Sequence, residues 1–109
     1  MTKAFDIGFG QTKNEISIGK LPVQGKVPEW IEGELIRNGP GTFKAGNESY
    51  KHWFDGLAML HRFSFADGKV SYQNKFLECA AYRETMEKNK ITYSEFGTNP
   101  NFTLLEQVK

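Results

Sequence analysis

The alternation of apolar and polar residues is clearest over residues 57–78, where two alternating segments flank a two-residue break. Leu57–Ala66 and Lys69–Glu78 lie on either side of the pair Asp67 and Gly68. An Asp-Gly pair between alternating segments is typical of a β-hairpin with a type I′ turn, because that turn needs positive φ at both central residues. The pattern therefore predicts an antiparallel hairpin.

The turn also fixes which residues of the two strands face each other. With Ala66 opposite Lys69, one face of the hairpin carries three apolar cross-strand pairs and one polar pair. These pairs are Phe65 with Val70, Phe63 with Tyr72, Met59 with Phe76, and the polar pair His61 with Asn74. The opposite face is more polar, so we expect one buried face and one partly hydrated face. A small sheet of this kind needs further structure to cover its aromatic side.

Weaker patterns predict the elements around the hairpin. We expect a short strand within Ile16–Gly25 and another in the second half of Trp30–Arg37. Asn38–Gly41 reads Asn-Gly-Pro-Gly, which is typical of a turn, because glycine permits positive φ and proline has no N–H to donate. Thr42–Tyr50 is predicted to be a polar loop, and Lys90–Gly97 a further strand.

Helical signals are short. Ala80–Lys88 has the composition of a helix but is too short to be stable alone, and the composition of Phe102–Lys109 allows the start of another. The predicted fold class is therefore all-β, with four or five short antiparallel strands. We divide the chain into an extended N-terminal arm, residues 1–17, and an incomplete β-domain, residues 18–109. At about 40–50 residues per blade, this is roughly one to two blades of a β-propeller.

Composition narrows the possible partners. The chain has 109 residues and a formal net charge of +1, so no basic excess favours nucleic acid as a partner. Its sequence holds no apolar run near 18 residues and no N-terminal apolar core of signal-peptide length. The one cysteine, Cys79, cannot form an intrachain disulfide, and its alanine neighbours suggest an apolar setting and an unreactive thiol. We expect a cytoplasmic protein.

Few residues suggest chemistry on their own. A metal site usually needs three or four ligands, and His52, His61 and the distant Cys79 do not supply them, so structural roles are favoured for both histidines. Asp55 precedes Gly56, which is typical of an aspartate that caps a turn, with a catalytic acid as the alternative. The residues alone show no complete catalytic constellation.

Four segments, taken together in their order and spacing, resemble the beginning of the carotenoid cleavage oxygenase family, which includes the retinal pigment epithelium isomerase. The segments are Val27–Gly41, His52–Phe63, Val70–Tyr72 and Glu95–Thr98. The likeness extends from about Ile18 to Pro100.

This resemblance implies a seven-bladed β-propeller with a non-haem Fe(II) held by four histidines. It implies reaction with O₂ at a double bond of a carotenoid or apocarotenoid, or in one branch isomerisation and hydrolysis of a retinoid ester. The family's iron-binding histidines are expected beyond Lys109, so no residue of this chain is expected to be a metal ligand or catalytic. His61 falls in a structural Asp-Gly-x-x-x-Leu-His segment. We therefore expect the 109-residue chain alone to hold no iron and to be inactive.

The resemblance also matches Phe54 and Phe96 to aromatic residues that line the family's apolar substrate tunnel. The alternative, that both are ordinary core aromatics, stays open. Asn101–Leu105 would begin a region through which the family contacts membranes, which gives a hypothesis of peripheral membrane contact. A different class of function also stays open, namely a non-catalytic β-module that binds an apolar ligand or partner through its aromatic face.

Overall fold

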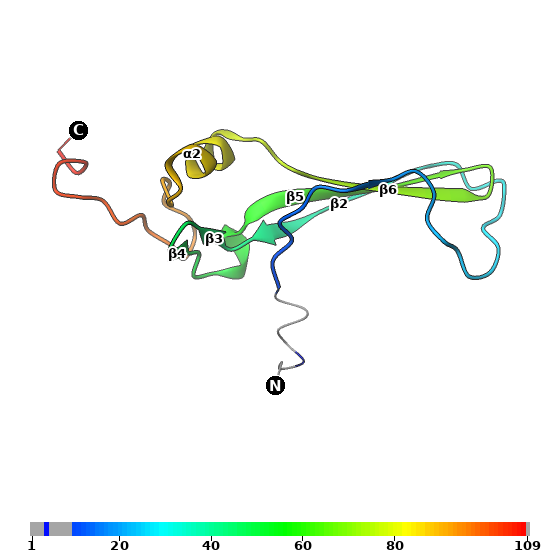
Figure 1. The fold of residues 1–109 in the computed structure, drawn as a ribbon, viewed down its shortest axis with the longest axis horizontal. Coiled ribbons are helices and arrows are strands. Elements are labelled where there is room, and N and C mark those ends of the chain that lie inside the picture. The colour runs from blue at the N-terminus through cyan, green and yellow to red at the C-terminus, as the bar shows by residue number, and fades with distance from the viewer. Residues whose placement is uncertain (1–3, 5–9, 109) are drawn as a thin grey trace.

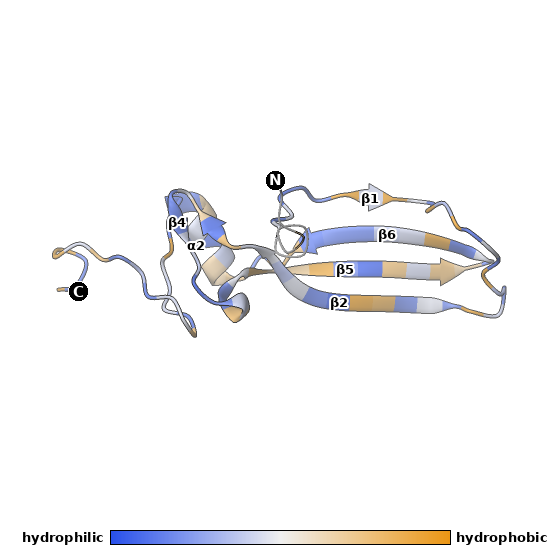
Figure 2. Cartoon of the chain, turned by 90° about the horizontal axis from the view of Figure 1, so that it is seen from below, coloured by the Kyte–Doolittle hydropathy of each residue, from blue (hydrophilic) through white to orange (hydrophobic). Residues whose placement is uncertain are grey.

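The computed structural model describes residue 4 and residues 10–108, which form a four-stranded antiparallel sheet, a small two-stranded sheet, a single 3-10 turn and a nine-residue helix. The elements are β1 Ser17–Ile18, β2 Gly33–Thr42, β3 Lys44–Ala45, β4 Glu48–Ser49, η1 Trp53–Asp55, β5 Leu57–Ala66, β6 Lys69–Phe76 and α2 Ala80–Lys88. The larger sheet has the order β1-β6-β5-β2 and extends away from α2 and the β3-β4 hairpin (Figures 1 and 2).

The predicted hairpin and its register are confirmed. β5 and β6 pair with Ala66 opposite Lys69, and each of the four predicted facing pairs follows. Asp67 and Gly68 both have positive φ, of 51° and 70°, as a type I′ turn requires. Local turn chemistry is therefore sufficient to set the register of this half of the sheet.

The polar pair on the apolar face has a specific role. Asn74 is buried, its side-chain Oδ1 accepts the backbone N–H of Ile16 at 2.7 Å, and its own backbone N–H donates to the Ile16 carbonyl at 3.0 Å. Next to it along the strands, His61 Nδ1 lies 2.7 Å from the Tyr72 hydroxyl. Asn74 thus holds the chain where it enters β1, which confirms the short strand predicted within Ile16–Gly25.

The turn predicted at Asn38–Gly41 is wrong. β2 continues through these residues to Thr42 and pairs with β5, with one irregularity between Pro40 and Thr42. β2 is an edge strand, where a proline that cannot donate to a ladder is tolerated. A Cβ on Gly41 would lie 2.6 Å from the Phe76 ring, so this glycine permits close packing rather than a turn.

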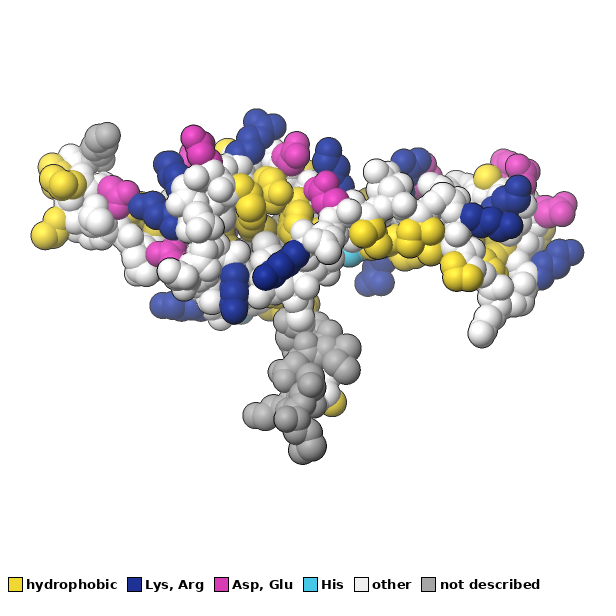
Figure 3. Space-filling view, in the orientation of Figure 1, with side chains coloured by type: hydrophobic (Ala, Val, Ile, Leu, Met, Phe, Trp, Pro, Cys, Tyr) yellow, Lys and Arg dark blue, Asp and Glu magenta, His cyan; other side chains and the backbone are white. Residues whose placement is uncertain are grey.

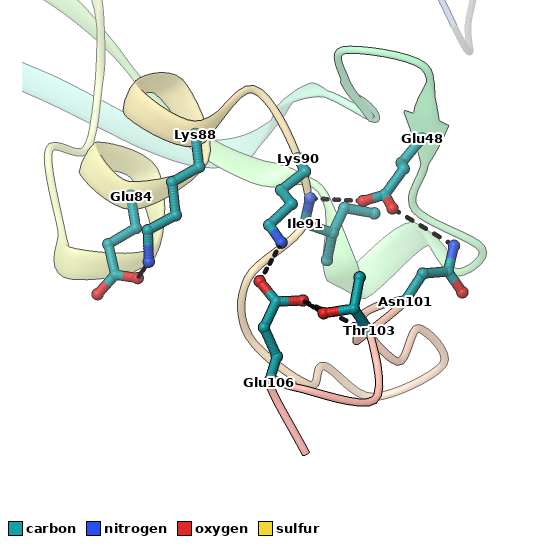
Figure 4. Close-up of polar contacts among 8 residues, drawn as sticks. All are labelled: Glu48, Glu84, Lys88, Lys90, Ile91, Asn101, Thr103 and Glu106. Carbon is teal, nitrogen blue, oxygen red and sulfur yellow. Dashed lines mark hydrogen bonds and ion pairs between the residues drawn. The ribbon is translucent and has the colours of Figure 1, made fainter. Parts of the chain in front are cut away.

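Two further predictions are corrected. Thr42–Tyr50 is not an irregular loop, because β3 and β4 form a short hairpin within it. Lys90–Gly97 forms no strand, and carboxylates accept the backbone N–H groups near both of its ends. Ile91 N–H donates to Glu48 Oε2 at 2.6 Å (Figure 4). Gly97 N–H donates to the Asp55 carboxylate.

The end of the described chain is held by one polar contact network and makes a single turn rather than a helix. Glu106 accepts Lys90 Nζ at 2.6 Å and both the N–H and the hydroxyl of Thr103 (Figure 4). The hydrogen bond from Lys90, followed by those from Thr103, lowers the pKa of Glu106 to about 2. Its carboxylate is therefore ionised at neutral pH, and it ties residues 103–106 back to the segment that follows α2.

The buried core is small and lies where α2 and the β3-β4 hairpin meet the near end of the large sheet. Its buried apolar members are Ala45, Tyr50, Leu57, Met59, Phe76 and Ile91. The predicted helix α2 is confirmed, and its Tyr82 ring stacks on Phe76 at 5.2 Å. The radius of gyration is 18.0 Å, whereas a compact domain of this length has about 13 Å. Most of the sheet therefore extends beyond the only core found among the described residues.

Candidate functional site

Two phenylalanines from distant segments lie side by side at the surface. Phe54 belongs to η1, and Phe96 lies in the irregular segment after α2, yet their ring centroids are 5.8 Å apart. The His52 ring contacts both, with centroid distances of 4.9 Å to Phe54 and 4.7 Å to Phe96. We call these three side chains, His52, Phe54 and Phe96, the ring cluster.

Both phenylalanines of the ring cluster are exposed. Phe54 is 74% exposed and Phe96 is 77% exposed, so neither belongs to the core of the described chain. Phe54 also borders a shallow cavity of about 220 Å³ whose walls include Pro40, Trp53 and Ala58. Large apolar rings grouped at a surface indicate a ligand or a protein surface that covers them.

A buried carboxylate joins the two segments that carry the rings. Asp55 is buried, and it accepts the N–H of Gly97, 3.0 Å from the nearer oxygen, and the Thr98 hydroxyl at 2.6 Å. The Thr98 hydroxyl in turn accepts the backbone N–H of Lys51 at 2.7 Å. This chain of hydrogen bonds, from Lys51 through Thr98 to Asp55 with Gly97 as a second donor, is called the carboxylate clamp.

The electrostatics of the carboxylate clamp follow from these contacts. Burial acts to raise the pKa of Asp55, but the hydrogen bonds from Thr98 and Gly97 outweigh it and hold that pKa below its usual value. Burial, and then the negative charge of Asp55, raise the pKa of Glu95. Asp55 is therefore an ionised acceptor at neutral pH, which does not suit the general-acid alternative.

The role that the sequence predicted for Asp55 differs from the contacts that it makes. Its hydrogen bonds run to residues more than 40 positions away rather than to its own turn, so the turn-capping role is wrong. Gly97 and Thr98 were missed as partners, although they belong to a segment that carried the family resemblance. A Cβ on Gly97 would lie 2.7 Å from the His52 Cβ, so the glycine lets the histidine pack directly on this backbone.

The two histidines are not brought together. His52 Nδ1 accepts the N–H of Phe54 at 3.1 Å, while His61 contacts Tyr72 on the sheet. Within residues 10–108 the structure has no group of three or more His, Cys, Asp or Glu side chains placed to hold a metal ion. The side chains that the structure describes therefore do not fit an iron site. Cys79 is exposed at the start of α2, so the apolar setting expected for it is wrong.

Comparison with known protein families shows which family the chain belongs to. Residues 9–108 match the family described as retinal pigment epithelial membrane protein. The chain belongs to this family. Known dioxygenases are also similar to most of this chain. Human β,β-carotene 15,15′-dioxygenase is 47% identical over 94 residues, which are 85% of this chain and 17% of that protein. The mitochondrial carotenoid-cleaving dioxygenase of Pongo abelii is 50% identical over 76 residues, 70% of this chain and 14% of that protein.

Solved structures of the family agree with the fold. A crystal structure of an ACO/RPE65 chimera superposes with a TM-score of 0.78 at 36% identity, covering 88% of this chain and 21% of the chimera. The Trp149Ala mutant of Synechocystis apocarotenoid oxygenase gives a TM-score of 0.78 at 35% identity, with the same coverage. The chain thus spans about a fifth of the structures that it matches. Because these family members are seven-bladed propellers, its antiparallel sheet is part of a propeller, as the sequence predicted.

No helix among the described residues of this family member is both long and apolar enough to cross a membrane.

Proposed function

We propose that the chain is the N-terminal part of a non-haem Fe(II)-dependent oxygenase that cleaves a double bond of a carotenoid or apocarotenoid with O₂, and that Phe54 and Phe96 line its substrate tunnel. The observation that carries the proposal is the ring cluster. The two residues that the resemblance matches to tunnel aromatics come from distant segments, yet their rings lie 5.8 Å apart and are largely exposed.

The physical properties of the ring cluster suit such a substrate. A polyene is long, rigid and apolar, and it gains affinity mainly from apolar area removed from water. Phenylalanine rings supply that area with few rotatable bonds, so little side-chain entropy is lost when they are ordered against a ligand. The names of the relatives, which are carotene and carotenoid dioxygenases, support the same substrate class.

We infer that the metal is bound outside this chain. A cobalt-substituted structure of the Synechocystis enzyme supports a metal centre in this family, whereas His52 and His61 lie apart and have other contacts here. We therefore propose that the 109-residue chain contributes part of the tunnel wall and no iron ligand, and that it is inactive alone.

A graft tests the proposal. The segment of human β,β-carotene 15,15′-dioxygenase that corresponds to residues 9–108 of this chain is replaced by those residues, and cleavage of β,β-carotene is measured together with iron content. We expect iron binding and O₂-dependent formation of aldehyde products. The human enzyme carrying an unrelated β-segment of equal length is the control.

The outcomes separate two classes of function. A folded, iron-loaded graft that forms no cleavage product would contradict the oxygenase proposal. If that iron-loaded graft instead bound the polyene without turnover, a non-catalytic module that binds apolar ligands would be favoured.

We also propose a cytoplasmic protein with a peripheral membrane contact near the C-terminal end of this chain. Leu104, Leu105 and Val108 are more than 80% exposed, and Phe102 is 46% exposed. Figure 3 shows hydrophobic side chains gathered at this tip of the molecule. Such a group adds apolar area that can enter the boundary between lipid headgroups and acyl chains.

We predict that the chain floats with phosphatidylcholine vesicles in a density gradient, and that the double substitution Leu104→Ser and Leu105→Ser abolishes most of the flotation. Flotation is chosen because aggregated protein sinks while vesicle-bound protein rises. Leu35→Ser with Ile36→Ser is the matched control, since these residues are also exposed but lie on β2. Equal loss in both variants would contradict a specific contact at the tip.

A further inference from the structure

The carboxylate clamp and the ring cluster are adjacent along both segments. Asp55 directly follows Phe54, and Gly97 directly follows Phe96. Asp55 accepts hydrogen bonds from Gly97 and Thr98, so the bond between the segments is made one residue from each ring. Asp55 and Thr98 are buried while the two rings are exposed, which places a polar anchor next to a paired apolar surface.

We propose that Asp55 and Thr98 are positioning residues that set the mutual placement of Phe54 and Phe96, and thereby determine which double bond of the substrate is cleaved. This inference rests on the proposed function, because it assigns a specificity role within the same tunnel wall. Neither residue is a catalytic residue, since both act through the rings.

The Thr98 hydroxyl is the centre of the clamp. It donates to Asp55 at 2.6 Å and accepts the Lys51 N–H at 2.7 Å, so a single oxygen joins the chain before η1, the carboxylate in η1 and the segment after α2. A serine keeps both bonds. A valine has nearly the same shape but can make neither, and it leaves the carboxylate and the Lys51 N–H without this partner.

Contacts with His52 restrain the two exposed rings once the clamp is formed. The His52 ring contacts both phenylalanines, and its Cβ lies where a side chain on Gly97 would be. The Glu95 N–H donates to the Thr98 carbonyl at 2.8 Å, which fixes the turn that carries Phe96. Loss of the clamp would release this turn from η1 and let the two rings move apart.

Loss of the clamp is expected to change where the substrate lies along the tunnel. A displacement of about 1 Å from the productive geometry can cost on the order of 100-fold in rate. Because the rings form part of the tunnel wall in the proposed function, we expect their displacement to shift the substrate along the tunnel, so that the proportion of products cut at different bonds changes.

The experiment uses the graft into human β,β-carotene 15,15′-dioxygenase, with product ratio, kcat, KM, iron content and melting temperature measured on one preparation. Thr98→Val is compared with Thr98→Ser. Thr85→Val is the matched control, because Thr85 is equally buried, at 2% exposed, but lies in α2 and contacts Tyr50 instead of the clamp. Asp55→Asn is the second variant, in case Thr98→Val does not fold.

We expect Thr98→Val and Asp55→Asn to change the product ratio by on the order of 10-fold with iron content unchanged, and Thr98→Ser to keep the original ratio. The double variant should change it no more than either single one. Thr85→Val should lower the melting temperature while the ratio stays constant.

Two results would overturn the inference. If Phe96→Ala alters the product ratio but folded Thr98→Val or Asp55→Asn does not, the tunnel assignment stands and the positioning role fails. If the iron-loaded, unsubstituted graft forms no product, the proposed function and the positioning role fail together.

Discussion

The isolated 109-residue chain is expected to bind a hydrophobic dye and to unfold without a sharp thermal transition. Its buried core is confined to one end, and its radius of gyration of 18.0 Å exceeds the value of about 13 Å for a compact domain of this length. Large apolar side chains along β2 and in the ring cluster are exposed, which favours self-association.

This prediction is checked by dye fluorescence, calorimetry and sedimentation of the purified chain, with the graft as the comparison in which neighbouring structure can cover the same surfaces. We expect strong dye fluorescence and a broad thermal transition for the chain. At equal molar concentration, the graft should give weaker dye fluorescence. A monodisperse monomer with a sharp cooperative transition would show that the chain is a self-sufficient domain.

Met59→Ala is expected to destabilise this part of the graft by about 2–5 kcal/mol. Met59 is 0% exposed and packs in the core between β2 and β6, opposite Phe76 on one side and Gly39 on the other. Alanine would leave a cavity, and the nearby backbone at Gly41 already packs so closely that it has little freedom to fill it.

The loss is measured as the urea concentration at which proteolysis within the grafted segment reaches half. Met86→Ala is the control, because it makes the same chemical change at a 47% exposed position in α2, where alanine suits a helix. We expect a large decrease for Met59→Ala and almost none for Met86→Ala. Equal changes would mean that the core around Met59 is not packed as described.

The parts of the fold that the sequence predicted are those set by local rules. The hairpin of β5 and β6 follows from Asp67 and Gly68, whose positive φ values fix the register of every later pair. The segment Asn38–Gly41 carries equally strong turn residues, yet it is a strand. Its conformation is decided by pairing with β5 and by the contact of Gly41 with Phe76, and neither is encoded locally.

In the candidate site, too, features that depend on distant contacts could not be predicted from local sequence. Phe54 and Phe96 were found only through the family resemblance, because no local pattern separates a tunnel residue from a core residue. The partners of Asp55 could not be predicted, since a carboxylate next to a glycine suggests a turn cap and nothing marks Thr98, 43 positions away, as its donor. Likewise Lys90–Gly97 has the composition of a strand, but the N–H groups of Ile91 and Gly97 donate to Glu48 and Asp55 instead of to a neighbouring strand.

The central claim, that this chain forms part of the wall of a carotenoid-cleaving tunnel through Phe54 and Phe96, is tested most directly by the product distribution of the Phe96→Ala graft. Phe96 is 77% exposed in this chain, so its removal should cost little of the chain's own packing. We predict an altered cleavage position or a weakened turnover of β,β-carotene, with iron content and melting temperature close to those of the unsubstituted graft. An unchanged product distribution together with a large fall in melting temperature would contradict the claim and make Phe96 a packing residue.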